Sequence, residues 1–180
     1  MSATSYLTAR QWLPRLLSGR PHQIIGEGSP YMLRWYVIPR NPVLNIYVHK
    51  FLRSDDDRAL HDHPWWFVSM ILRGRYAEIS EQPLKVRRAG SIAYRPAEYR
   101  HRVELLCAPS ALKGRGPLMP AWTLIVTGRR VRTWGFWCKT APWKLTGPPN
   151  VTPRRVVYYQ GPDRFIPWQE FGDAGCGEPS

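Results

Sequence analysis

The chain has 180 residues, enough for one domain with a hydrophobic core and short for two. It carries 26 Lys and Arg against 13 Asp and Glu, a formal charge of +13, and such a field attracts anions. No apolar run approaches the roughly 20 residues that a membrane-spanning helix needs, while 18 Pro and 14 Gly favour short segments joined by turns over a helical bundle.

The chain begins with a segment of helical periodicity and continues with segments typical of strands. Residues 3–18 predict one amphipathic helix, which Pro14 interrupts or delays. From residue 24 onward, β-branched and aromatic residues predict strands. The predicted strands are residues 31–38, 44–51, 66–72, 75–79, 84–87, 91–94, 102–106, 122–127, 132–137 and 155–159. Short strands with regular Gly, Pro and Asp breaks indicate an all-β sandwich or closed barrel, and we find no internal repeat or composition shift that would divide it.

Two of the five histidines stand two residues apart, in Leu60-His61-Asp62-His63-Pro64. Residues two apart on a strand face the same side, so both imidazoles are expected to point into one space. This arrangement is half of a metal site in a barrel interior. His22 and His49 lie outside this pattern and are expected to be ordinary surface or packed residues.

A second segment completes the pattern. Gly90 is followed after five residues by Pro96, and His101 follows five positions later. Together with His61-x-His63 and Gly74, this spacing resembles the two motifs of the cupin superfamily. The resemblance implies a small double-stranded β-helix, the cupin jelly-roll barrel, with a short N-terminal helix. It implies one cupin-like domain over residues 1–180, with a motif core of about 44–137 and a Pro-rich extension over 139–180.

Several motif positions depart from the cupin pattern. Phe67 stands where the first motif has its ligand Glu, and Asp55 where it has its leading Gly. Glu98 replaces the Gly after Pro96, and Leu105 replaces the final Asn. The resemblance is therefore to the three-histidine subset of cupins, with His61, His63 and His101 as metal ligands. Glu98 is a candidate fourth ligand or a partner of one of the histidines.

Three neutral imidazoles suit a divalent metal, and we expect Fe(II), with Ni, Co, Cu, Zn and Mn as alternatives. The alternative to a metal site is that the three histidines line the barrel without a metal, as in epimerase-like cupins that use a His as base. By alternation from the histidines, Trp65, Phe67 and Ser69 are expected on the same inward face.

Polar residues close to His101 in the sequence are candidates for catalysis. Arg95 and Arg100 are candidates to clamp a carboxylate or phosphate by paired hydrogen bonds. Tyr99 is a candidate to donate a proton or a hydrogen bond to a bound intermediate.

The three cysteines, Cys107, Cys138 and Cys176, are odd in number and lack metal-ligand spacing. We therefore expect no disulfide framework, a reducing cytoplasm and no catalytic thiol. The functional hypothesis is a non-haem Fe(II) dioxygenase acting on a small anionic substrate. The alternatives are a non-redox cupin, such as an isomerase or epimerase, and a ligand-binding or regulatory cupin without turnover. Nucleic acid and membranes are not expected as partners. Cupins often pair through edge strands, so the resemblance allows a homodimer, and the sequence leaves the oligomeric state open.

Overall fold

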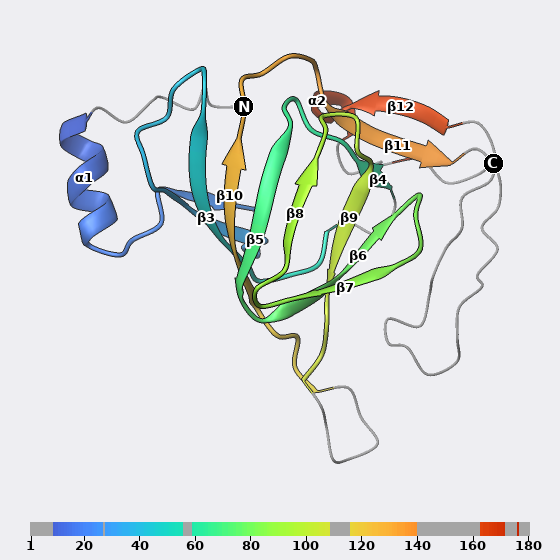
Figure 1. Ribbon diagram of the computed structural model, residues 1–180, viewed down its shortest axis with the longest axis horizontal. Helices are drawn as coiled ribbons and strands as arrows, with labels where there is room; N and C mark the ends of the chain where they lie inside the picture. Colours follow the sequence, from blue (N-terminus) through green and yellow to red (C-terminus); the bar gives the residue numbers. More distant parts are fainter. Residues whose placement is uncertain are drawn as a thin grey trace.

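The computed structural model describes residues 9–26, 28–55, 59–108, 116–139, 163–171 and 176. Its strands form two six-stranded antiparallel sheets that face each other (Figure 1). The first sheet contains, in spatial order, β1 (Gln23–Ile25), β2 (Met32–Tyr36), β3 (Asn45–Phe51), β10 (Ala121–Thr127), β5 (Phe67–Arg73) and β8 (Ile92–Arg95). The second contains β12 (Asp163–Pro167), β11 (Gly135–Lys139), β4 (Leu60–His61), β9 (His101–Leu105), β6 (Arg75–Ser80) and β7 (Lys85–Arg88).

Successive strands pass back and forth between the two sheets. From β3 to β6, and again from β8 to β11, each strand lies in the sheet opposite to the one before it. In between, β7 pairs with β6 as a hairpin. This winding, with long antiparallel pairings such as β3 with β10, is the double-stranded β-helix or jelly roll. The predicted all-β fold is confirmed.

Most predicted strands occur within a few residues of their expected bounds. The structure adds the short strands β1 and β4, and also β12, which follows the Pro-rich segment. The predicted strand 155–159 lies outside the described residues. α1 (Ala9–Leu17) forms with Pro14 inside it, and residues 3–8 of the predicted helix are outside the described part. A short helix that was not predicted, α2 (Trp168–Phe171), follows β12.

The main hydrophobic cluster lies towards one end of the barrel. On β3 the inward residues alternate with partly exposed ones, as a strand between a core and solvent requires. Seven buried residues from six strands form the main cluster: Met32, Phe51, Ile71, Tyr76, Val103, Leu105 and Ala121. β9 contributes Val103 and Leu105 to this cluster, while its first residue, His101, lies towards the other end of the barrel, where polar side chains line the interior.

The cysteine prediction is wrong for two of the three residues. Cys138 on β11 and Cys176 form a disulfide that spans 38 positions of the sequence, while Cys107 has a free thiol. β12 pairs with β11 and so brings the C-terminal part of the chain back towards Cys138. The spacing of the cysteines in the sequence does not indicate a contact of this kind. The cysteines therefore no longer indicate a reducing compartment.

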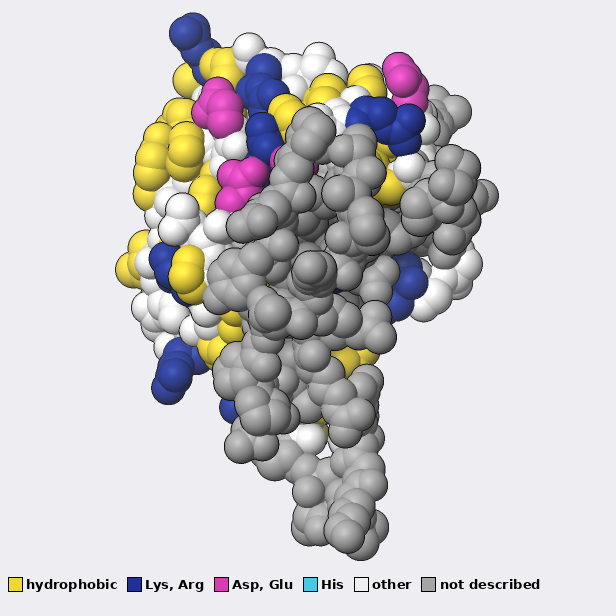
Figure 2. All heavy atoms as spheres, turned by 90° about the vertical axis from the view of Figure 1, so that its right-hand side faces the viewer, with side chains coloured by type: hydrophobic (Ala, Val, Ile, Leu, Met, Phe, Trp, Pro, Cys, Tyr) yellow, Lys and Arg dark blue, Asp and Glu magenta, His cyan; other side chains and the backbone are white. Residues whose placement is uncertain are grey.

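The outside of the barrel mixes charge types on the face drawn in Figure 2. There, described Lys and Arg side chains stand in small separate groups among hydrophobic and acidic ones. Within the described residues, no helix has the length and apolar character needed to cross a membrane.

Two motif glycines provide a matched test of the fold. Gly74 and Gly90 both have a left-handed backbone, with φ of 83° and 85°, but only Gly74 is crowded. A Cβ at Gly74 would lie 2.5 Å from the Pro120 carbonyl oxygen, whereas nothing lies within 4 Å of one at Gly90. We expect Gly90→Ala to lower the free energy of unfolding by about 1–2 kcal/mol through backbone strain. Gly74→Ala should lower it by about 1–3 kcal/mol more because the backbone at Pro120 must move.

Urea unfolding of both variants measures this difference. Equal losses of stability would contradict the close approach of Gly74 to Pro120.

Candidate metal centre

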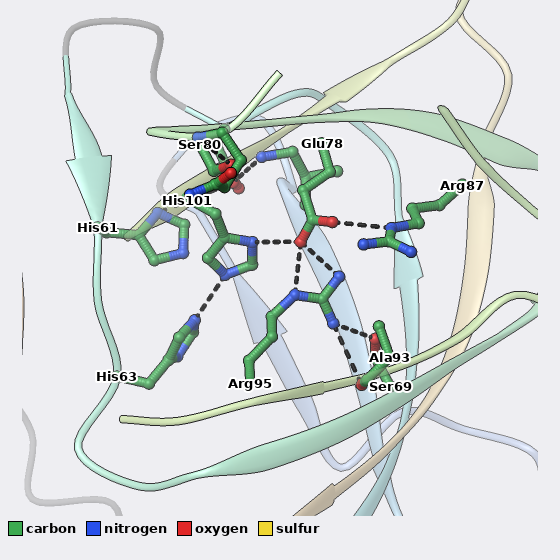
Figure 3. Close-up of polar contacts among 12 residues, drawn as sticks. His61, His63, Ser69, Glu78, Ser80, Arg87, Ala93, Arg95 and His101 are labelled. Carbon is green, nitrogen blue, oxygen red and sulfur yellow. Dashed lines mark hydrogen bonds and ion pairs between the residues drawn. The ribbon is translucent and has the colours of Figure 1, made fainter. Parts of the chain in front are cut away.

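Three histidines from two strands and a loop converge inside the barrel (Figure 3). His61 ends β4 and pairs across the sheet with His101, the first residue of β9. His63 lies in the loop after β4, which a hydrogen bond from the His63 backbone N–H to the Ala97 carbonyl (3.1 Å) holds in place. One ligand atom from each ring lies within 4.8 Å of the others. The predicted grouping of His61, His63 and His101 is confirmed.

The residue between the first two histidines anchors their loop. The side chain of Asp62 is fully buried and points away from the cluster. It accepts hydrogen bonds from the Gly135 backbone N–H (3.0 Å) and from Trp137 Nε1 (2.9 Å), and it pairs with Arg132. These contacts tie the His61–His63 segment to β11, so both imidazoles stay directed inward even though β4 is only two residues long.

Burial keeps the imidazoles of His61 and His63 uncharged. It lowers the pKa of His61 to about 4, because desolvation outweighs the opposing charge of Asp55. Burial also lowers the pKa of His63 well below its usual value, and the charges of His61, His101, Arg95 and Arg34 lower it further. Neutral imidazoles have a free nitrogen lone pair, the form that binds metal.

These rings fit a divalent metal ion. The Nε2 atoms of His63 and His101 lie only 3.0 Å apart and face each other. A nitrogen-only set suits Fe, Ni, Co, Cu and Zn, so the donor atoms by themselves do not select among them. Three protein ligands leave coordination positions open to the cavity, as in catalytic rather than structural sites.

The position of the missing motif Glu is filled by an aromatic ring. Phe67 is buried, and its ring centroid lies 4.6 Å from that of His63 and 5.7 Å from that of His101. Trp65, Phe67 and Ser69 all line the same cavity as the histidines, as alternation predicted. Glu98 is exposed and does not belong to the cluster among the described residues.

A carboxylate that sequence reasoning missed lies behind His101. Glu78 on β6 is 1% exposed, and its Oε1 lies 3.3 Å from His101 Nδ1. Burial by itself would raise the pKa of Glu78, but the contact with His101 and the charges of Arg95 and Arg87 outweigh it and lower the pKa to about 2. An ionised carboxylate at Nδ1 favours the tautomer with the proton there, which leaves Nε2 free to bind metal. The available signal was a single acidic residue within the apolar strand Tyr76–Ile79.

Arg95 reaches the same carboxylate from the facing sheet. Its guanidinium is 2% exposed, pairs with Glu78 and donates from Nη1 to Ser69 Oγ at 2.7 Å. Arg87 binds the other oxygen of Glu78 at 2.8 Å. The ion pair therefore joins β6, β7 and β9 of one sheet to β5 and β8 of the other (Figure 3).

The other predicted catalytic residues have distinct surroundings. Arg100 binds Glu81 and Asp163 and lies over the Trp137 ring. The ring of Tyr99 lies 5.5 Å from that of His101, and the Arg95 guanidinium is 5.7 Å from the Tyr99 ring. The catalytic roles assigned to Tyr99, Arg95 and Arg100 stay predictions.

A cavity of about 1600 Å³ extends from the histidines through the barrel. Aromatic side chains line it near His61, with Trp134 stacked on Trp168 and in edge contact with His61. Farther along, its wall on β2 and β3 carries Arg34, Tyr47 and His49. His49 is buried, which agrees with the expectation of a surface or packed residue. The cavity is large enough for a small molecule that contacts both regions.

The role of Glu78 is tested with Glu78→Gln. We expect metal affinity to fall about 10–100-fold, because His101 loses the carboxylate that orients it. The metal-free protein should lose about 3–5 kcal/mol of stability, because Arg95 becomes a buried cation without its partner. Calorimetric metal titration and urea unfolding measure the two effects.

Glu81→Gln is the matched control, because the Glu81 carboxylate is half exposed and pairs with Arg100 away from the histidines. Equal metal affinity in both variants would contradict a positioning role for Glu78.

Comparison with protein-family models gives no match, and neither does comparison with curated proteins. Among solved structures, a putative mannose-6-phosphate isomerase from Ralstonia eutropha has 20% identity and a TM-score of 0.45, over 58% of this chain and 91% of that one. An uncharacterized protein with a double-stranded β-helix domain from Klebsiella pneumoniae has 16% identity and a TM-score of 0.43, over 62% and 87%. A Cupin 2 conserved barrel domain protein from Leptotrichia buccalis has 18% identity and a TM-score of 0.41, over 58% and 43%.

These likenesses are distant, so we take the fold from the chain itself. The strands wind between two facing sheets, and both motif segments deliver their histidines to one place. The chain therefore has the double-stranded β-helix fold of the cupins, with a three-histidine cluster where the two motif segments meet.

Proposed function

We propose that this protein is a metal-dependent cupin enzyme that holds a divalent ion with His61, His63 and His101 and acts on a small anionic molecule. The observation that carries the proposal is the convergence of three imidazoles, those of His61 and His63 partly buried and that of His101 buried, with ligand atoms within 4.8 Å of one another at the wall of a large cavity. A merely structural role for these rings would bury three polar groups against one another with little gain in stability.

Dioxygenation is the reaction class that we propose first. Fe(II), when bound, would supply the activation of O₂, and the three protein ligands leave positions for O₂ and substrate. The protein's own contribution is to orient the ligands and to keep water away. Glu78 holds the proton of His101 on Nδ1, and the Phe67 ring covers the side of the cluster where a fourth ligand stands in other cupins.

A non-redox reaction is the second candidate, favoured by the contact between Glu78 and His101. A carboxylate that orients an imidazole raises its basicity and prepares its free nitrogen to accept a proton. Without metal, His101 would then be the base of an isomerase or epimerase, with Tyr99 beside it as a proton donor.

Metal binding separates these two candidates. We expect Fe(II), Zn²⁺ or Ni²⁺ added to the metal-free protein to raise its Tm, because a ligand that binds only the folded state stabilises it. His101→Ala should remain folded and lose most of this rise, whereas His22→Ala should keep it, because His22 lies outside the cluster and contacts Trp12 and Tyr36. A Tm that no metal raises in the wild-type protein would reject the metal-dependent reading.

The reaction class is tested by O₂ consumption. Protein loaded with Fe(II) under anaerobic conditions is mixed with oxygenated buffer and a panel of thiol carboxylates and aromatic acids. We expect uptake of O₂ with one of these compounds, and at least about 100-fold slower uptake by His101→Ala. Turnover that needs bound metal but consumes no O₂ would reject dioxygenation and leave the non-redox metal enzyme.

A further inference from the structure

An arginine that has no acidic partner among the described residues lies on the cavity wall that faces the metal centre. Arg34 is the middle residue of β2, and like Met32 it faces inward and lines the cavity that contains the three histidines. β2 belongs to the first sheet, whereas His61 and His101 belong to the second. The guanidinium is therefore presented from the sheet opposite to two of the histidines.

Neutral side chains hold this guanidinium in place. Nε donates a hydrogen bond to His49 Nε2 at 2.8 Å, and Nη1 donates one to Gln23 Oε1 at 3.2 Å. Tyr36 also donates to Gln23 Oε1 and so fixes the amide. The guanidinium carbon lies 5.1 Å from the centre of the Tyr47 ring. Of the five N–H groups of an arginine, three are left for another acceptor.

No carboxylate among the described residues pairs with Arg34, and this sets it apart from the arginines near the metal centre. Arg95 is paired with Glu78, Arg100 with Glu81 and Asp163. Burial lowers the pKa of Arg34, which reflects the cost of keeping this charge out of water. An anion from solution that binds there offsets that cost, whereas one that approaches Arg95 or Arg100 must compete with a carboxylate that is already bound.

Arg34 and the three histidines line the same cavity, so one molecule inside it can contact both. Arg40, which lies over the Tyr36 ring and lines the same cavity, adds positive potential at this end. Two acidic residues line the cavity, and both have partners other than Arg34. Asp55 accepts from the Tyr31 hydroxyl and the Val103 backbone N–H and lies 3.8 Å from His61 Nδ1, and Glu104 pairs with Arg102.

We propose that Arg34, positioned by His49 and Gln23, binds the carboxylate of the substrate while the other end of the same molecule lies at the three histidines. The inference rests on the proposed function and specifies its substrate class as a small carboxylic acid. A guanidinium offers a planar carboxylate parallel N–H groups and a full positive charge. We therefore assign to Arg34 the anion-binding role for which the sequence offered Arg95 and Arg100 as candidates.

Benzoate and benzamide test this subsite, because they share a shape and differ in charge. Their affinities for the full-length protein are measured by tryptophan fluorescence, in the metal-free form so that benzoate cannot bind to a metal ion. We expect wild-type protein to bind benzoate at least about ten-fold more tightly than benzamide, as a charge-assisted pair of hydrogen bonds implies. In Arg34→Gln the preference should fall below about two-fold, and in Arg88→Gln it should persist, because Arg88 is exposed on β7.

Two outcomes would overturn the proposal. One is a benzoate preference that survives in folded Arg34→Gln protein. The other is tighter binding of inorganic phosphate than of benzoate, which would replace the carboxylate class. The titration uses metal-free protein, so both results are independent of the effect of Zn²⁺ on the Tm. That effect tests the proposed metal-dependent function separately.

A measurement on the wild-type protein covers the case in which Arg34→Gln does not fold. Phenylglyoxal modifies accessible arginines, and peptide mass mapping reports the extent at each one. We expect benzoate, and not benzamide, to slow the modification of Arg34 while that of Arg88 is unchanged. Equal modification of Arg34 with and without saturating benzoate would contradict the proposal.

Discussion

The buried ion pair between Glu78 and Arg95 is the interaction on which the rest of the interior depends. Both side chains are almost fully buried, so each charge relies on the other and on the polar groups around it. The pair comes from facing sheets, and it therefore fixes how β6 and β8 lie across the barrel. The same carboxylate contacts His101, so the packing of the two sheets and the orientation of a metal ligand are parts of one arrangement.

Apolar and polar side chains are concentrated in different parts of the barrel interior. A hydrophobic cluster lies towards one end and supplies burial that stabilises the fold. Five of its residues also line the cavity: Met32, Phe51, Tyr76, Val103 and Leu105. The rest is lined by histidines, aromatic rings and arginines, whose polar groups are mostly paired with one another. Within this lining, the three histidines and Arg34 have donor or acceptor capacity for a ligand, and Thr123 Oγ1 and Arg102 Nε likewise have no hydrogen-bond partner among the described residues. The proposed carboxylate subsite rests on the position of Arg34 in the sheet opposite to His61 and His101.

Sequence reasoning was most successful where local spacing determines geometry. Alternation along a strand predicted that His61, His63, Trp65 and Phe67 share one face, and the second segment predicted His101 as their partner. The absence of a carboxylate ligand at position 67 was likewise visible. The carboxylate partners of Arg95 and Arg100 were not visible in the sequence. These two arginines were chosen for their closeness to His101 in the sequence, whereas the carboxylates that pair with them come from other parts of the chain.

By itself, the sequence determined the all-β class, the inward face of each motif segment and the identity of the three histidines. The first two depend on periods of two residues and on turn residues, which are local, whereas His101 was identified through the resemblance of its segment to the second cupin motif. The tertiary structure decided the rest: the placement of Glu78 behind His101, the disulfide between Cys138 and Cys176, and the open guanidinium of Arg34 beside His49. These contacts depend on which strands become neighbours when the chain crosses between two sheets, and no short stretch of sequence contains that information.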